Sequence, residues 1–356
     1  MRLRNYFFSL VFIFGWWGFF YPEKREICIE EERVKPSLPF EPIDRNSLVA
    51  GLRGDWGEVE RLIALWSMEA DTLKSYGLSD IQQLSPKEFK EAIQLSKWIQ
   101  SAHYQPPQKK ILPQTYVSAT ILLACASEDQ LVALPQGLRS QEELFPKSKT
   151  SKIVVNCHEL NAETIYQTKP NLAFVASYSN PTFLKTLDLL QIPRSATDQI
   201  NTVEDVYQTI EEVGRQSAYP YQGRLLSLFV KGALFASENR LIMVTPGKNL
   251  EILYLTYGNP YHLPSPNTLL GSLLQRLKIN AFVESKNSFW EIPITLEEIK
   301  EKNPHALIFS NNRAPLPSLK KYPIYSVSEV VQNSPTQFIA LAHRDLCACL
   351  MEMYQL

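Results

Sequence analysis

The strongest constraint on the fold is a pattern that the chain carries twice. Residues 161–174 and 295–308 each combine a helix N-cap, an acidic first turn, a short helical run, a proline and an apolar segment, at a constant offset of 134 residues. The residue pairs that are identical between the copies are Glu163/Glu297, Ile165/Ile299 and Pro170/Pro304. A short helix that a proline stops and a buried strand follows is a unit of α/β structure. The repetition therefore predicts two similar α/β lobes.

Strand-like and helix-like segments alternate around both copies, which is typical of layered α/β proteins. The predicted strands are residues 110–112, 130–134, 153–155, 172–176, 241–245, 306–310 and 324–326. The predicted helices are residues 118–126, 162–168, 181–190, 266–277, 295–302 and 336–353. We therefore predict two Rossmann-like lobes, an N-terminal one at residues 109–200 and a C-terminal one at residues 237–356.

The segment between the lobes has a longer helical pattern. It opens at Thr202, keeps apolar residues at helical spacing, and resumes after Pro220. We predict that residues 201–236 include one long helix that links the lobes. A helix that spans the molecule resists hinge closure, so we expect the lobes to move little when a ligand binds.

A small helical extension precedes the lobes, at residues 30–108 with its linker. Asp55 followed by Glu58 has the spacing of a capping box, and Gly77 is a stop signal. A second helix begins at Ser85 and Pro86, where proline fits the first turn. The proline-rich residues 105–110 read as a stiff linker.

Residues 1–22 combine a basic start with an apolar run of about 15 residues, which are the proportions of a secretory signal. This run is short for a membrane-spanning helix, which needs ~20 apolar residues. The bulky residues after Gly15 lack the usual small-residue cleavage site. We interpret the segment as a signal or N-terminal anchor, with a buried apolar segment of a cytosolic protein as the alternative.

Composition and motifs argue against several functions. A net charge of −1 provides no excess of cations for a nucleic-acid backbone. The five cysteines show no paired C-x-x-C spacing, and the five histidines are scattered, so we expect no disulfide framework, metal site or cofactor. Phosphate-loop, serine-hydrolase and zinc-protease motifs are absent from the sequence. An enzyme would need a catalytic constellation that the sequence lacks.

Residues 160–193 resemble a run found in the binding proteins that feed ferric siderophores, haem or cobalamin to ABC importers, the class whose lobes are joined by a single long helix. Residues 202–206 resemble the start of that linking helix, and residues 295–308 repeat the pattern in the second lobe. The likeness covers about residues 110–356. Asn171 and His305 replace the aspartate that usually follows the proline, the lipid-attachment motif is absent, and residues 30–108 have no counterpart in the core family.

The resemblance implies partners and a location. The protein would be a monomer in the periplasm or on the outer face of the cytoplasmic membrane, either released from its signal or held by an N-terminal anchor, and would dock onto an ABC permease with its ATPase. Glu163 and Glu297 occupy the positions that dock each lobe onto permease arginines. A glutamate in the first turn of a helix is also ordinary compensation of the helix dipole, so this simpler role stays open.

In such two-lobed proteins, the ligand lies outside the carboxyl ends of the strands. The residues that we expect to bind the ligand there are Tyr116, Tyr178, Tyr257, Trp290 and Arg313. Aromatic faces suit planar macrocycles, a tyrosine phenolate can ligate haem iron, and arginine pairs with anionic chelates. The sequence thus predicts a receptor for an iron complex, haem or a corrinoid. The alternative is an adaptor or scaffold built on a degenerate binding-protein fold.

Overall fold

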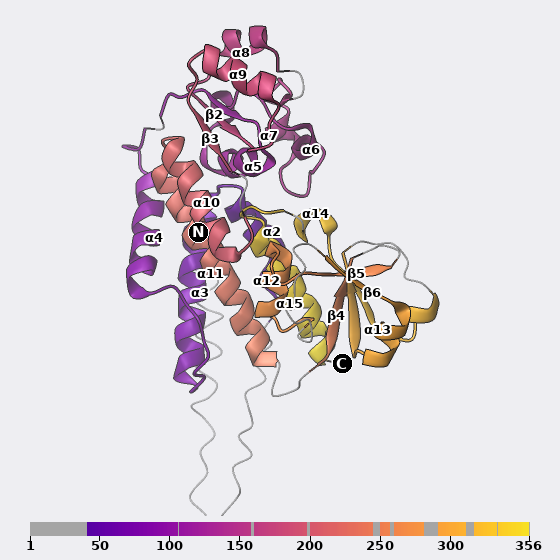
Figure 1. Ribbon diagram of the computed structural model, residues 1–356. Coiled ribbons are helices and arrows are strands. Elements are labelled where there is room, and N and C mark those ends of the chain that lie inside the picture. Colours follow the sequence, from indigo (N-terminus) through magenta and orange to yellow (C-terminus); the bar gives the residue numbers. More distant parts are fainter. Residues whose placement is uncertain are drawn as a thin grey trace, which may run out of the picture. The chain divides into compact units, whose positions relative to one another are not determined.

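The computed structural model describes residues 41–356 except 106, 158–159, 198–199, 245–249, 257–259, 281–290, 311–316, 333 and 356 (Figure 1). The predicted signal or anchor, residues 1–22, lies outside the described residues. The chain divides into Met1–Pro39 and Phe40–Leu356, and the description below concerns the second unit. Among the described helices, none has both the length and the apolar character that crossing a bilayer requires.

The first lobe is built on a parallel three-stranded sheet. Its strands are β1 (Ile111–Pro113), β2 (Leu172–Val175) and β3 (Arg194–Ala196), in that spatial order. Its helices are α5 (Tyr116–Cys125), the short α6 (Gln136–Arg139) and α7 (Lys147–Thr150), α8 (Ala162–Thr168) and α9 (Pro181–Leu189), with a 3₁₀ turn η1 at Glu128–Gln130. The strands predicted at residues 130–134 and 153–155 are wrong: the first segment makes only isolated parallel bridges, from Leu131 to Ile111 and from Leu134 to Asn156, and the second forms no strand.

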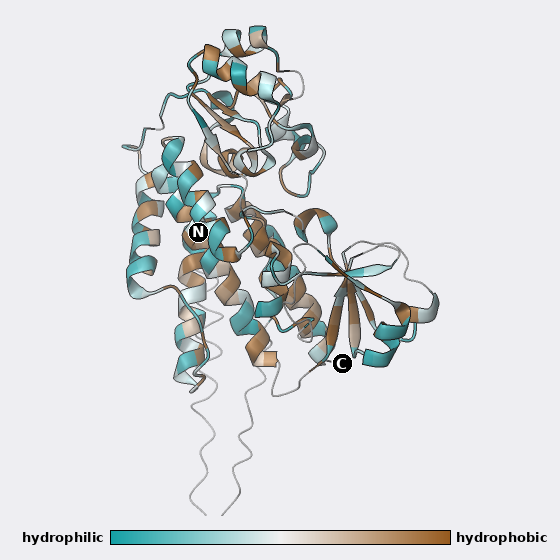
Figure 2. Ribbon diagram, in the orientation of Figure 1, coloured by the Kyte–Doolittle hydropathy of each residue, from teal (hydrophilic) through white to brown (hydrophobic). Residues whose placement is uncertain are grey.

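The second lobe repeats the parallel arrangement and adds a hairpin. The parallel strands are β4 (Ile252–Leu255), β7 (Ala306–Phe309) and β8 (Ile324–Ser326), and β5 (Tyr261–Pro264) pairs antiparallel with β6 (Glu291–Ile294). The helices are α12 (Leu269–Arg276), α13 (Leu296–Lys302), α14 (Glu329–Gln332) and α15 (Ile339–Gln355), with a 3₁₀ turn η3 at Pro317–Leu319. Strands β4 and β7 are buried along their whole length, and the strands of this lobe are largely hydrophobic (Figure 2). Such continuous apolar strands are typical of parallel sheets that are covered on both faces.

The two copies of the repeated pattern fold alike, which confirms the two-lobe prediction. Helices α8 and α13 begin after N-caps at Asn161 and Thr295, and each ends at a residue with left-handed backbone, φ 43° at Lys169 and φ 46° at Asn303. The shared isoleucine of each helix is buried. Strands β2 and β7 follow at the same offset of 134 residues.

The linking segment consists of two helices, α10 (Val203–Gln216) and α11 (Pro220–Val244). The 25-residue α11 is the long connecting helix, and α10 packs along it where Gly214 meets Gly223. The strand predicted at residues 241–245 is wrong, because Leu241 to Val244 form the last turn of α11. Met243 packs against a small cluster that includes Leu73, so contacts with the extension favour the helix here.

The helical extension consists of α2 (Arg45–Leu52), α3 (Trp56–Ser75) and α4 (Pro86–Ile99). The caps predicted at Asp55 and Ser85 are present, whereas α2 was not among the predicted helices. Trp66 of α3 stacks on Phe229 of α11 with ring centroids 5.3 Å apart. Three ion pairs tie the extension to α11 along its length: Glu91–Arg224, Glu88–Lys231 and Glu69–Arg240. The extension is therefore packed onto the connecting helix over several turns (Figure 1).

Candidate functional site

The carboxyl edge of the first sheet carries polar side chains that bond to one another. Ser179 donates from Oγ to Oε1 of Gln114 at 2.6 Å, and the hydroxyl oxygens of Thr115 and Thr197 lie 2.8 Å apart. These residues follow β1, β2 and β3, so the parallel topology brings them to one edge. Because their hydrogen bonds are made inside the protein, this edge is held in a defined shape.

The two described tyrosines of the predicted site lie at this edge in different surroundings. Tyr116 is half-buried at the start of α5, and its hydroxyl donates to Oε1 of Gln141. Burial raises the pKa of Tyr116, and hydrogen bonds with Ser334 and Thr120 only partly oppose this. Tyr178 lies in the turn after β2 and is 85% exposed. Tyr178 is therefore open to solvent, whereas the Tyr116 hydroxyl is already held by a hydrogen bond within its own lobe.

Three predicted ligand-binding residues, Tyr257, Trp290 and Arg313, lie outside the described residues. Their segments follow β4, precede β6 and follow β7, respectively, which are the positions that the sequence analysis assigns to the edge of the second lobe.

A cavity of about 350 Å³ opens beside the carboxyl end of β4 in the second lobe. The described residues that line it are Thr256, Pro264, Thr268, Leu269, Leu270, Glu291, Gln332 and Pro335. Thr256 donates from Oγ1 to Oε1 of Glu291 at 3.2 Å, which ties the end of β4 to the start of β6. Ligand pockets span about 300–1,000 Å³ and are mostly apolar, and this cavity meets both criteria. Sequence reasoning missed these lining residues because it did not predict the β5–β6 hairpin.

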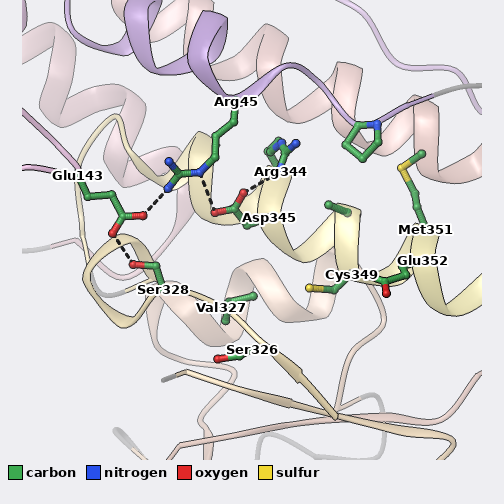
Figure 3. Close-up of a pocket in the computed structure, with 12 residues that line it drawn as sticks. Arg45, Glu143, Ser326, Val327, Ser328, Arg344, Asp345, Cys349, Met351 and Glu352 are labelled. Carbon is green, nitrogen blue, oxygen red and sulfur yellow. Dashed lines mark hydrogen bonds and ion pairs between the residues drawn. The ribbon is translucent and has the colours of Figure 1, made fainter. Parts of the chain in front are cut away.

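A larger cavity, about 440 Å³, lies where α2, the loop after α6, the end of β8 and α15 meet (Figure 3). Arg45 pairs with Glu143 and, at 3.8 Å, with Asp345, while Ser328 donates to Glu143 at 2.7 Å. Arg344 also pairs with Asp345, at 2.9 Å. Four of the charged groups of this cavity, Arg45, Glu143, Arg344 and Asp345, are thus engaged with one another, so we regard the smaller, apolar cavity as the better ligand site.

The two predicted docking glutamates occupy equivalent, exposed positions. Glu163 is the second residue of α8, and Glu297 is the second residue of α13. Glu163 accepts a hydrogen bond at 3.1 Å from Gln167 one turn later. Both carboxylates therefore remain accessible at the first turn of matching helices.

Several reactive side chains of the described residues are buried, and none belongs to a metal-binding cluster in this part of the chain. No cluster of three or more His, Cys, Asp or Glu with the geometry of a metal site occurs in the described part of the chain. Burial raises the pKa of Cys125 and Cys157 to about 12, so neither thiol is a ready nucleophile. The fully buried His343 bonds to Glu238 at 3.0 Å and joins α15 to α11 within the core.

Several solved structures share the fold of this chain. No protein-family model and no curated protein matches the chain by sequence. The periplasmic heme-binding protein HutB of Vibrio cholerae superposes with a TM-score of 0.55 and 16% identity, over 68% of this chain and 99% of that one. The periplasmic heme-binding protein RhuT from Roseiflexus sp. RS-1 superposes with a TM-score of 0.54 and 16% identity, over 70% of this chain and 100% of that one. FhuD2 from Staphylococcus aureus with bound ferrioxamine B superposes with a TM-score of 0.52 and 15% identity, over 69% of this chain and 99% of that one.

The chain has the fold of these periplasmic heme-binding proteins. Each of the three neighbours is covered almost completely by the superposition. The share of this chain that they match corresponds in size to the two lobes with their connection. At such low identity, the likeness concerns the fold alone.

Proposed function

We propose that the protein is the substrate-binding receptor of an ABC importer, located in the periplasm or on the outer face of the cytoplasmic membrane. It captures an iron complex, haem or a corrinoid between its lobes, delivers it to the permease, and performs no chemistry itself. The fold supports this proposal, since its neighbours bind haem or ferrioxamine B.

The observation that carries the proposal is the equivalence of Glu163 and Glu297. The two carboxylates lie on matching helices of matching lobes, each exposed and each in the first turn. A receptor that must dock both lobes onto a permease needs one anchor on each lobe. Charge-assisted pairs with arginine would set orientation as well as affinity.

We further propose that the ligand contacts both edges. Tyr116 and Tyr178 lie on the edge of the first lobe, and the cavity beside Thr256 lies on that of the second. Gln337, two residues after the cavity-lining Pro335, donates to the carbonyl oxygen of Thr120 in α5, the helix that begins at Tyr116, so the second lobe reaches the first at this point. Tyr257, Trp290 and Arg313 complete the proposed set.

Titration of the full chain, monitored by tryptophan fluorescence, with haem, ferrioxamine B and cobalamin tests the proposal. We expect saturable binding of one of the three. Loss of a buried aromatic or arginine anchor costs about 2 kcal/mol, so Tyr116→Ala, Tyr178→Ala and Arg313→Ala should each weaken binding roughly thirtyfold. Tyr166→Ala, which removes an exposed tyrosine of α8, is the matched control and should bind normally.

Two results would count against this assignment. Wild-type affinity in all three variants would mean that the ligand lies elsewhere. Failure of all three ligands to bind would favour the adaptor or scaffold instead, in which the fold persists without a working cleft.

A further inference from the structure

The start of the helical extension, residues 43–53, contacts the first lobe; we call it the clasp segment. Arg53 donates from Nε to the carbonyl oxygen of Leu144 at 2.6 Å. Its Nη2 donates to the carbonyl oxygens of Glu143 at 3.0 Å and Glu142 at 3.2 Å. One guanidinium therefore binds three successive carbonyl groups in the loop that follows α6. A planar, multiply bonded arginine holds its partner in a fixed orientation.

The clasp segment also contacts the second lobe. Arg344 of α15 donates from Nε to the carbonyl oxygen of Ile43 at 2.8 Å. The fully buried Gln337 donates from Nε2 to the carbonyl oxygen of Leu52 at 3.3 Å and to that of Thr120 in α5 at 3.0 Å. A single side chain of the second lobe thus joins the clasp segment and the first lobe at one point.

Arg45 of the clasp segment lies between Glu143 and Asp345, as Figure 3 shows. It bridges Glu143 of the first lobe and Asp345 of the second, and Ser328 at the end of β8 bonds to the same Glu143. Burial raises the pKa of Asp345, and the charge of Glu143 adds to this effect, whereas Arg344 and Arg45 oppose it. Without Arg45, two carboxylates on different lobes would repel each other across the cavity.

We propose that the clasp segment fixes the opening between the two lobes. The connecting helix resists large hinge closure, but it does not join the facing edges of the lobes, so small rotations about the ends of α11 remain open. A second attachment away from that helix restrains these rotations. The bonds of Arg45, Arg53 and Gln337 add to the direct bond between Ser328 and Glu143, and all of them must break for the lobes to part. This inference concerns the free protein and does not depend on the proposed function.

Distance measurements between the lobes test the clasp. Spin labels are introduced through unnatural amino acids at positions 166 and 300, because native thiols such as Cys157 and Cys349 are partly accessible. Tyr166 and Lys300 are exposed and occupy equivalent positions of α8 and α13. Electron–electron double resonance should give one narrow distance distribution for the free wild-type protein.

In the variant Arg45→Gln/Arg53→Gln, the width of this distance distribution should at least double, or a second population should appear at longer distance. Arg215→Gln removes an exposed arginine that pairs with Glu212 on its own helix, and it should leave the distribution unchanged. If the double variant does not fold, Arg45→Gln alone serves, because this side chain is 38% exposed. A distribution in the clasp variant that is as narrow as in the control would overturn the proposal, and so would a broad distribution in the wild type.

Discussion

Asn171 and His305 differ in chemistry but make the same hydrogen bond. Oδ1 of Asn171 accepts from the backbone N–H of Lys110 at 2.8 Å, and Nδ1 of His305 accepts from that of Glu251 at 3.0 Å. Their own backbone N–H groups donate back to the carbonyl oxygens of the same two residues. Each residue therefore pins the strand after it to the start of the neighbouring strand. His305 can accept only as a neutral ring with its proton on Nε2.

This shared role predicts which substitutions the two positions tolerate. His305→Asp and Asn171→Asp keep an acceptor and should leave the free energy of unfolding nearly unchanged. His305→Ala and Asn171→Ala each remove one exposed hydrogen bond and should lower the free energy of unfolding by about 0.5–1 kcal/mol. The two effects should add in the double variant, because the two sites lie in different lobes. Urea denaturation of the single and double variants measures both effects. An aspartate variant as unstable as its alanine counterpart would show that the acceptor does not matter.

At the scale of elements, the close approach of α10 and α11 depends on two glycines. A Cβ atom added at Gly214 would come within 2.8 Å of the Cα atom of Gly223 and within 2.9 Å of the carbonyl oxygen of Tyr219. Both obstacles are backbone atoms, which cannot rotate out of the way. The hairpin of α10 and α11 therefore requires the absence of side chains at this crossing.

We expect Gly214→Ala to destabilise the protein by about 1–3 kcal/mol, because the overpacking outweighs the better helix propensity of alanine. Gly137→Ala is the matched control, since Gly137 also lies in a helix but its added Cβ would meet no atom within 4 Å. The control should be neutral or slightly stabilising. Thermal unfolding of both variants distinguishes the effects, and equal stability of the two would contradict the packing argument.

At the scale of the whole molecule, the two lobes present one carboxylate each to the proposed permease. Reversing both charges in Glu163→Lys/Glu297→Lys should abolish uptake in proteoliposomes that contain the permease and its ATPase. Ligand affinity should stay at the wild-type value, because neither residue lines the cavity. Glu301→Lys, an exposed change on the same α13, is the control and should support uptake. Unimpaired uptake by the double variant would refute the docking role.

Much of the fold was predictable because its signals are local. The caps at Asp55 and Ser85, the proline stops and the repeated helix–strand unit arise from interactions within a few residues, and the structure contains all of them. The matching apolar runs were sufficient to predict two lobes. Of the predicted ligand-binding residues, Tyr116 and Tyr178 do lie at the carboxyl edge of the first sheet, since that position follows directly from the end of a strand.

Other features required contacts that no local pattern encodes. Leu241 to Val244 is an apolar run short enough for a strand, but it continues the 25-residue α11, where Met243 packs against the cluster that includes Leu73 of α3. The pairing of β5 with β6 joins segments about 30 residues apart in the sequence. Because no local pattern predicts this pairing, the cavity beside Thr256 was not predicted. The bond of Tyr116 to Gln141 and the bridge from Arg45 to Glu143 and Asp345 also depend on long-range packing. Local sequence therefore specifies the lobes, whereas long-range packing decides how the extension and the lobes are held together.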